Sequence, residues 1–105
     1  MELIMTFKDK NGTEHRFKKF PMIGAGATYP ATSGVYIMTK HEKPVYIGQS
    51  EDLSKWLVPG HKKEACAKKA GADAVYILEA PKSETEKIAQ DLIYAYNPEC
   101  NGEGK

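Results

Sequence analysis

The sequence predicts an α+β domain: a small, mostly antiparallel sheet with helices packed around it. Two pairs of β-rich runs are each joined by a short polar turn, and one amphipathic helix lies near the C-terminus. The chain has 105 residues, of which 41% are hydrophobic and 28% charged, and this suits one soluble domain and is too short for two. We therefore expect one globular domain with a single core.

The first hairpin is predicted from residues 2–8 and 13–20, which flank an Asn-Gly pair at 11–12. Both turn residues accept positive φ at little cost, and this favours a tight reversal of the chain. Residues 21–33 contain two glycines, two prolines and several small side chains, a composition typical of a loop. We assign residues 1–33 to an N-terminal extension made of this β-hairpin and loop.

A second hairpin is predicted from the runs 34–38 and 44–47, which are rich in β-branched and aromatic residues around a polar connection. Residues 74–78 form a further apolar run of strand length.

Two short helices are expected between these strands. Ser50 is placed to cap the first, which runs to about Leu57 before a Pro-Gly pair. The second spans roughly residues 62–70 and ends at Gly71.

The last helix has the clearest pattern. Ser83 and Glu86 fit a capping box, so the helix should run from Glu84 to about Tyr96 and stop before an Asn-Pro pair. At 100° per residue, one stripe should face the sheet, with Ala89 near its middle. Its members are Ile88, Ala89, Leu92, Ile93 and Tyr96. The outward face is expected to hold Lys87, Gln90, Asp91 and Tyr94.

Charge is unevenly distributed along a chain whose net charge is only +1. Residues 55–71 hold five lysines and one glutamate, whereas residues 73–103 hold seven acids and two lysines. This asymmetry indicates either a basic and an acidic face, or simply two helices with differently charged solvated surfaces.

Localisation signals are not apparent. No apolar run is long enough to span a bilayer, and the N-terminus has no basic region of a signal peptide. The two cysteines, Cys66 and Cys100, match no zinc or redox spacing. We therefore expect a cytoplasmic protein with reduced thiols and no membrane partner.

Two tripeptides carry a family resemblance: residues 34–36 read Gly-Val-Tyr, and residues 46–48 read Tyr-Ile-Gly. Together they resemble the two signature strands of the GIY-YIG nucleases of excision repair and phage homing. The polar turn and leucine at 49–53 resemble the start of that family's first helix. Leu-Ile at 92–93 and Pro-x-x-Asn at 98–101 resemble its last helix and the segment that follows. We assign residues 34–101 to a GIY-YIG-like domain and 102–105 to a tail.

The resemblance implies hydrolysis of phosphodiesters with one divalent metal. In the family, two tyrosines line the site, an arginine steadies the phosphate and a glutamate holds the metal; a fixed cation and a hard carboxylate suit this chemistry. Tyr36, Tyr46 and Asn101 retain family positions, whereas Trp56 stands at the arginine position and Ala89 at the glutamate position. We expect the three retained residues to converge beside one cleft, with the two replaced positions lining it.

Other side chains could compensate for the two losses. The candidates are Arg16, Glu51, Asp52, Lys55, His61, Glu86 and Asp91. Acids at a helix start mostly serve the helix dipole, the capping box already uses Glu86, and a histidine between glycine and lysine is usually solvated. We therefore predict no metal site; magnesium or manganese would be a cofactor only if catalytic residues have moved.

Trp56 has two interpretations. It could stack on a nucleobase, which contributes about 1–3 kcal/mol per base. It could instead fill the emptied cleft as a core side chain beside two leucines, and we favour this because small helices need such anchors.

Three functions remain open. The first is a catalytically degenerate GIY-YIG domain that binds nucleic acid or a protein. The second is an active nuclease with relocated residues, and the third is a small phage or mobile-element interaction or inhibitor protein that keeps only the fold. Weak, sequence-indifferent contact with DNA or RNA is expected through lysines on the two short helices. These are Lys55, Lys62, Lys63, Lys68 and Lys69.

Overall fold

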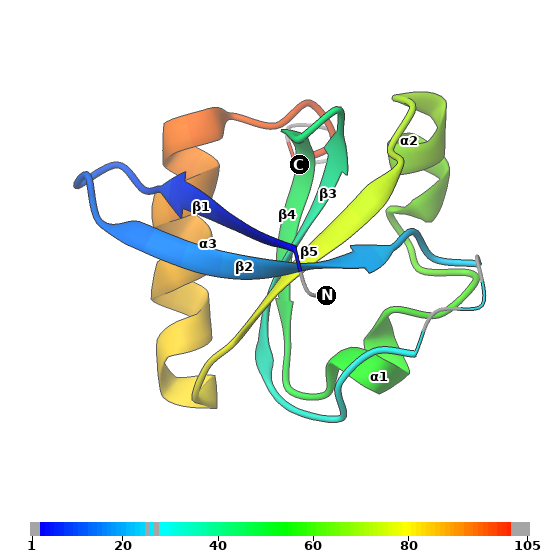
Figure 1. Ribbon diagram of the computed structural model, residues 1–105, viewed down its shortest axis with the longest axis horizontal. Helices are drawn as coiled ribbons and strands as arrows, with labels where there is room; N and C mark the ends of the chain where they lie inside the picture. The colour runs from blue at the N-terminus through cyan, green and yellow to red at the C-terminus, as the bar shows by residue number, and fades with distance from the viewer. Residues whose placement is uncertain (1–2, 25, 27, 102–105) are drawn as a thin grey trace.

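A five-stranded antiparallel sheet in the order β1-β2-β5-β3-β4 forms the centre of the protein (Figure 1). The computed structural model describes residues 3–24, 26 and 28–101. In chain order the elements are β1 (Ile4–Lys8), β2 (Glu14–Pro21), β3 (Gly34–Lys40), β4 (Lys43–Ser50), α1 (Leu53–Trp56), α2 (Glu64–Lys69), β5 (Ala74–Glu79) and α3 (Lys82–Tyr96). The α+β class expected from the sequence is confirmed, with both hairpins and the later strand in place.

The N-terminal hairpin is built into the sheet. Strand β2 pairs with β5 from Lys18 opposite Ile77 to Pro21 opposite Ala74. Because β5 also pairs with β3, it lies between the N-terminal hairpin and the hairpin of β3 and β4. The N-terminal residues therefore extend the same sheet that carries the signature tyrosines.

Alternation along the strands gives the sheet two buried faces. Tyr36 and Met38 of β3 belong to a core cluster shared with α1 and α2, and we call this side the tyrosine face. Val35 and Ile37 point the other way, into a cluster shared with α3, and we call this side the α3 face. Figure 1 shows α3 on one side of the strands and the two short helices on the other.

The two predicted serine caps are wrong. Helix α1 is capped by Asp52, whose side chain accepts a hydrogen bond from the Ser54 backbone N–H at 3.1 Å. Helix α3 begins at Lys82 after Pro81, with no side-chain capping bond. Proline suits this position because its fixed φ and missing N–H fit a helix start, and the box built on Ser83 is not needed.

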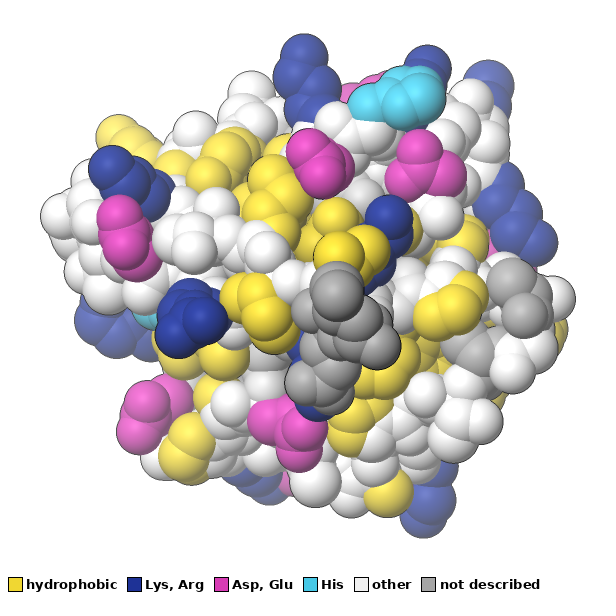
Figure 2. Space-filling view, in the orientation of Figure 1, with side chains coloured by type: hydrophobic (Ala, Val, Ile, Leu, Met, Phe, Trp, Pro, Cys, Tyr) yellow, Lys and Arg dark blue, Asp and Glu magenta, His cyan; other side chains and the backbone are white. Residues whose placement is uncertain are grey.

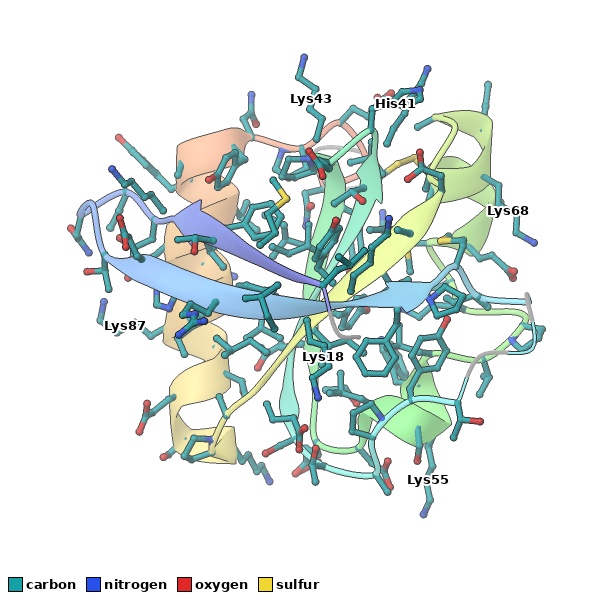
Figure 3. All side chains as sticks on the ribbon, in the orientation of Figure 1. Lys18, His41, Lys43, Lys55, Lys68 and Lys87 are labelled. Carbon is teal, nitrogen blue, oxygen red and sulfur yellow. A yellow bond between two sulfur atoms is a disulfide. The ribbon has the colours of Figure 1, made fainter. Side chains whose placement is uncertain are left out.

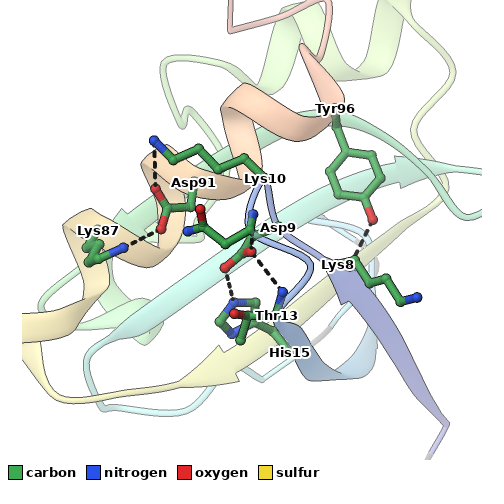
Figure 4. Close-up of polar contacts among 9 residues, drawn as sticks. Lys8, Asp9, Lys10, Thr13, His15, Lys87, Asp91 and Tyr96 are labelled. Atoms are coloured by element: carbon green, nitrogen blue, oxygen red, sulfur yellow. Dashed lines mark hydrogen bonds and ion pairs between the residues drawn. The ribbon is translucent and has the colours of Figure 1, made fainter.

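The hairpin of β1 and β2 docks on α3 through polar contacts (Figure 4). Asp91 is buried, 6% exposed, and its carboxylate pairs with Lys87 at 2.6 Å and with Lys10 at 3.7 Å. The Tyr96 hydroxyl accepts a hydrogen bond from the Lys8 backbone N–H at 3.1 Å. The prediction that Asp91 faces solvent is therefore wrong, because the hairpin covers that side of the helix.

The cysteines also differ from expectation. Cys66 of α2 and Cys100, which follows α3, form a disulfide with their Cα atoms 6.0 Å apart. The prediction of two reduced thiols is wrong, and the bond is of a kind that persists mainly in oxidising compartments. Among the described residues, no helix is long and apolar enough to cross a membrane.

Candidate functional site

The glycines of the two signature tripeptides make room for the site. A Cβ on Gly48 would lie 2.6 Å from the Tyr36 hydroxyl and 2.9 Å from Cε2 of Tyr46. A Cβ on Gly34 would lie 2.5 Å from the Leu78 carbonyl oxygen and 2.9 Å from Leu53. Both glycines are therefore required by close approach of other atoms, and Gly48 in particular lets the two tyrosine rings lie over β4.

The Tyr36 hydroxyl is enclosed by two ring nitrogens. It accepts a hydrogen bond from the indole N–H of Trp56 at 2.8 Å, and it lies 2.7 Å from Nε2 of His61. Nδ1 of His61 accepts the Lys63 backbone N–H at 3.0 Å, so the network places the proton of the neutral imidazole on Nε2. His61 thus donates to Tyr36 as well, and Tyr36 is 0% exposed.

Burial controls the ionisation of these groups. It raises the pKa of the Tyr36 hydroxyl far above its ordinary value, and the neighbouring Tyr46 raises it further. Burial also raises the pKa of Tyr46, although a hydrogen bond from Tyr36 opposes this shift. The same desolvation lowers the pKa of His61, because its charged form is disfavoured away from water. All three groups are therefore neutral at pH 7.

Trp56 lies over this cluster without being buried in it. Its ring centroid is 5.3 Å from that of His61, and the residue is 42% exposed. The expectation of a core side chain filling the cleft is wrong, because the indole N–H is held by Tyr36 while the ring stays open to solvent.

His61 is the site residue that the sequence interpretation undervalued. It is 7% exposed, and its ring lies 5.6 Å from Tyr36 and 6.0 Å from Tyr46. The expectation that it is solvated is wrong. A Gly-His-Lys context gives no local sign of burial.

Ala89 does not share this site. It is 2% exposed and belongs to the core of the α3 face, with Val35 and Ile37. Because Trp56 contacts the tyrosine face, the two replaced positions lie on opposite sides of the sheet. The expectation that they line one cleft is wrong, since helical periodicity showed that Ala89 faces the sheet without showing which face.

Asn101 is held at the edge of the sheet. Its side-chain oxygen accepts from the Ile47 backbone N–H, and its side-chain nitrogen donates to the Ile47 carbonyl, both at 2.8 Å. Ile47 lies on the edge strand β4, so this amide takes the place of a neighbouring strand. Both ends of the side chain are used in this contact.

The residues present do not fit the divalent metal that the fold family implies. The glutamate position holds a buried methyl group at Ala89, and the amide of Asn101 is occupied by Ile47. Within the described part of the chain, no group of three or more His, Cys, Asp or Glu side chains is arranged to hold a metal ion.

The candidate lysines are spread over the surface. Lys55 projects from α1, and Lys68 projects from α2 in a different direction (Figure 3). Lys68 pairs with Glu64 at 2.9 Å, which offsets part of its charge. Lys55, Lys62, Lys68 and Lys69 are exposed and Lys63 is partly buried. The described geometry therefore brings Lys55 near Trp56 on α1 without gathering all five lysines into one patch.

The chain has the fold of the GIY-YIG superfamily. It is similar to the GIY-YIG N-terminal endonuclease domain of UvrC from Thermotoga maritima. The magnesium-bound domain matches with a TM-score of 0.60 and 28% identity over 69% of this chain and 85% of that one. A tyrosine-to-phenylalanine mutant bound to its catalytic divalent cation matches with a TM-score of 0.59 and 28% identity over 69% and 84%. No family model and no curated protein sequence matches the chain significantly.

Proposed function

We propose that this chain is a GIY-YIG domain that binds single-stranded nucleic acid without cleaving it. One observation carries the proposal. Trp56 stands where the resemblance places the arginine that steadies the phosphate, its N–H is bonded to Tyr36, and 42% of the residue is exposed. Trp56 thus replaces a cation that would bind phosphate. Its N–H also engages the hydroxyl of a signature tyrosine, and its ring presents an aromatic surface to solvent.

Loss of cleavage follows from the state of Tyr36. Its hydroxyl is buried, accepts from two ring nitrogens and has a raised pKa, so it is poorly placed to take a proton from water. The missing guanidinium and carboxylate remove stabilisation of transition-state charge, which typically amounts to several kcal/mol.

A cleavage assay tests this part. Purified protein with magnesium or manganese should leave duplex, branched and single-stranded DNA and RNA intact. The control is the Tyr36→Phe variant, which should behave as the parent does. Metal-dependent cutting that disappears in Tyr36→Phe would contradict the proposal and favour the active nuclease; a parallel loss in Glu86→Gln would then identify the relocated carboxylate.

Binding is proposed through stacking and phosphate contacts. An exposed indole accepts any nucleobase, because every base has a π face. Lys55 is one residue away on α1 and is exposed, as is Lys62 beside His61, and such lysines release counterions when they neutralise phosphates. We expect weak, sequence-indifferent binding that falls steeply as salt increases.

Trp56 is the only tryptophan in the chain, so its fluorescence reports stacking directly. Titration with a thymidine oligonucleotide at low salt should quench it to a plateau, and Trp56→Leu should abolish binding measured by anisotropy of a labelled oligonucleotide. Tyr94→Leu is the matched control, since Tyr94 is 77% exposed on α3. Lys55→Glu should weaken binding, whereas Lys43→Glu, at the opposite end of the molecule (Figure 3), should not.

A protein partner is the second candidate. Val58 is 40% exposed and lies two residues after Trp56 in the chain; if a partner covers both side chains, they would form part of an apolar contact. Absence of quenching at low salt, or anisotropy indifferent to both Trp56→Leu and Lys55→Glu, would reject nucleic acid and leave this candidate.

A further inference from the structure

The disulfide joins two segments that hold different parts of the site around Tyr36. Cys66 lies in helix α2, and Cys100 lies in the segment that follows helix α3. Figure 3 draws the bond between their sulfur atoms in yellow, close to α2. Each segment is in turn attached to a ring of the site, as the hydrogen bonds on both sides of the bond show.

On one side of the bond, the start of α2 holds His61. The His61 carbonyl accepts the Glu64 backbone N–H at 2.9 Å, and Nδ1 of the His61 ring accepts the Lys63 backbone N–H at 3.0 Å. The Glu64 carboxylate also accepts the Gly60 backbone N–H at 2.8 Å. A displacement of α2 therefore moves both the backbone and the ring of His61.

On the other side of the bond, Cys100 is fixed to strand β4. Its backbone N–H donates to the Val45 carbonyl at 2.9 Å. Tyr46 is the next residue of β4, and its ring lies 6.0 Å from that of His61. The disulfide therefore ties the helix that holds His61 to the strand that holds Tyr46.

Helix α2 is weakly held by the core. It has six residues, of which Ala67 is the buried one, and no side chain caps its start. A helix this short is unstable by itself and depends on tertiary contacts. Lysine side chains project at the margin of the molecule where α2 lies (Figures 1 and 2), so its outer side faces solvent. The covalent bond through Cys66 is therefore a main restraint on its position.

We propose that the disulfide between Cys66 and Cys100 is a redox switch for the Trp56 site. The oxidised bond holds α2 in place, so that His61 donates to Tyr36 and its ring lies 5.3 Å from the Trp56 indole. Reduction releases α2, and the indole loses this neighbour. The effect on nucleic-acid binding rests on the proposed function, whereas the effect on the arrangement of His61 does not.

A dithiol supplies the electrons for the reduction. One thiolate of the dithiol attacks the sulfur of Cys66, which is the partly exposed residue of the pair. The S–S bond breaks, and Cys100, which is 0% exposed, leaves as the thiolate. The second thiol of the reductant then attacks the mixed disulfide and releases Cys66. The protein gains two electrons and two protons, and the dithiol that loses them closes to a disulfide.

Nuclear magnetic resonance of the full ¹⁵N-labelled chain tests the switch, with dithiothreitol as the reductant and mass spectrometry to show that the bond has broken. Trp56 is the only tryptophan, and its single indole N–H signal should move toward that of a solvated indole on reduction. The Lys63 amide signal should move as well, because its acceptor is the His61 ring. The Val35 amide, inside the sheet on the α3 face, should keep its position.

Titration of the His61 ring by the same method gives a reading that loosened packing elsewhere would not change. Burial lowers the pKa of His61 in the oxidised protein, so reduction should move this pKa back toward the ordinary value of 6.5. An unchanged pKa would show that His61 keeps its place without the bond, and it would overturn the switch.

Anisotropy of a labelled thymidine oligonucleotide at low salt measures the effect on binding. The reduced parent should bind roughly twofold to tenfold more weakly than the oxidised parent, which is the scale of ordering one large side chain. Cys66→Ser/Cys100→Ser should bind as the reduced parent does and should be indifferent to dithiothreitol. Cys66→Ala/Cys100→Ala repeats the test without a buried hydroxyl, and reoxidation of the reduced parent should restore the tighter binding.

The two readings separate this inference from the proposed function. Binding in neither redox state, with the Trp56 and Lys63 signals moved by reduction, rejects nucleic-acid binding and supports the switch. Unmoved signals after the bond is broken overturn the switch, as does equal or tighter binding by the reduced protein. Displacement of the Val35 signal to its unfolded position also overturns it, because the bond would then hold the whole fold rather than this site.

Discussion

Gly48 shows how a single residue positions the two signature tyrosines. It pairs with Tyr36 across the β3–β4 ladder, and the tyrosine rings, 5.9 Å apart, occupy the space that a side chain there would need. The family motif includes a glycine at position 48, and the packing of the two tyrosine rings explains why a larger residue would not fit there.

Gly48→Ala should therefore destabilise the protein by about 1–3 kcal/mol, because an added methyl group must displace Tyr36 or Tyr46. Urea unfolding followed by circular dichroism measures this change. The variant should also raise the solvent exposure of Trp56, which loses its fixed partner at Tyr36. An unfolding midpoint equal to that of the parent would show that the rings move aside freely.

His61 makes stability depend on pH. Its pKa in the folded protein is lowered from the ordinary 6.5, mainly by burial and less by the charge of Lys62, while Glu64 opposes the shift. The unfolded chain therefore takes up this proton at a higher pH than the folded chain does. The free energy of unfolding should therefore keep its highest value, as far as His61 is concerned, above about pH 6.5 and should decrease as the pH falls below that value.

Urea unfolding at about pH 7.5, 6.5, 5.5 and 5.0 tests this window, which spans the ordinary histidine pKa. His61→Gln should flatten the dependence, whatever it does to stability itself. His41→Gln is the control, since the His41 side chain is 83% exposed and its loss should leave the slope unchanged. An identical slope in the parent and in His61→Gln would assign the effect to another group.

At the scale of elements, β4 is an edge strand, and the side chain of Asn101 covers part of its outer edge. The two hydrogen bonds of Asn101 satisfy the Ile47 backbone N–H and carbonyl, so this part of the edge offers no pairing surface to another chain. The retained asparagine therefore has a structural task that does not require catalysis.

Asn101→Ala should cost roughly 1–3 kcal/mol, because it leaves the Ile47 backbone groups unpaired at a partly buried position. Hydrogen exchange is the sharper measurement: the Ile47 amide should exchange faster, while the Val35 amide inside the sheet should keep its protection. Asn11→Ala, in the exposed β1–β2 turn, should change neither amide. An unchanged exchange rate at the Ile47 amide would mean that water replaces the side-chain amide of Asn101 without loss of protection.

The elements were largely predictable because their signals are local. An Asn-Gly pair, β-branched runs and a Pro-Gly stop each act over a few residues, so both hairpins and the positions of the helices follow from sequence. The start of α3 is set by Pro81, a local signal that the capping-box interpretation passed over. The burial of Asp91 was not predictable, because it depends on the docked hairpin, whose Lys10 is distant in the chain but forms an ion pair with Asp91.

At the scale of the whole molecule, the candidate site depends on which face of the sheet each element covers. Tyr36 and Tyr46 were expected to lie together because of the family resemblance of the two tripeptides, and their rings are 5.9 Å apart. The separation of Ala89 from Trp56 is set by α3 crossing to the other face, and periodicity along a helix carries no information about that. The pairing of Cys66 with Cys100 also joins two segments that no local pattern places together.

The disulfide should contribute substantially to stability. It closes a loop between residues 34 positions apart, for which the chain-entropy model gives roughly 3–4 kcal/mol. Cys66→Ser/Cys100→Ser should lower the free energy of unfolding by about this amount, and dithiothreitol should lower that of the parent only. A parent whose stability is unchanged although mass spectrometry shows that the reductant has broken the bond would contradict the estimate.

The same bond has a consequence for fragmentation. Strand β5 and helix α3 both lie between Cys66 and Cys100, so a protease that nicks the backbone within this span releases neither piece. The nicked protein would keep the mass of the parent plus one water and migrate as a single species without reductant. Only thiol treatment would separate the fragments, so limited proteolysis of this protein must be judged on reducing gels.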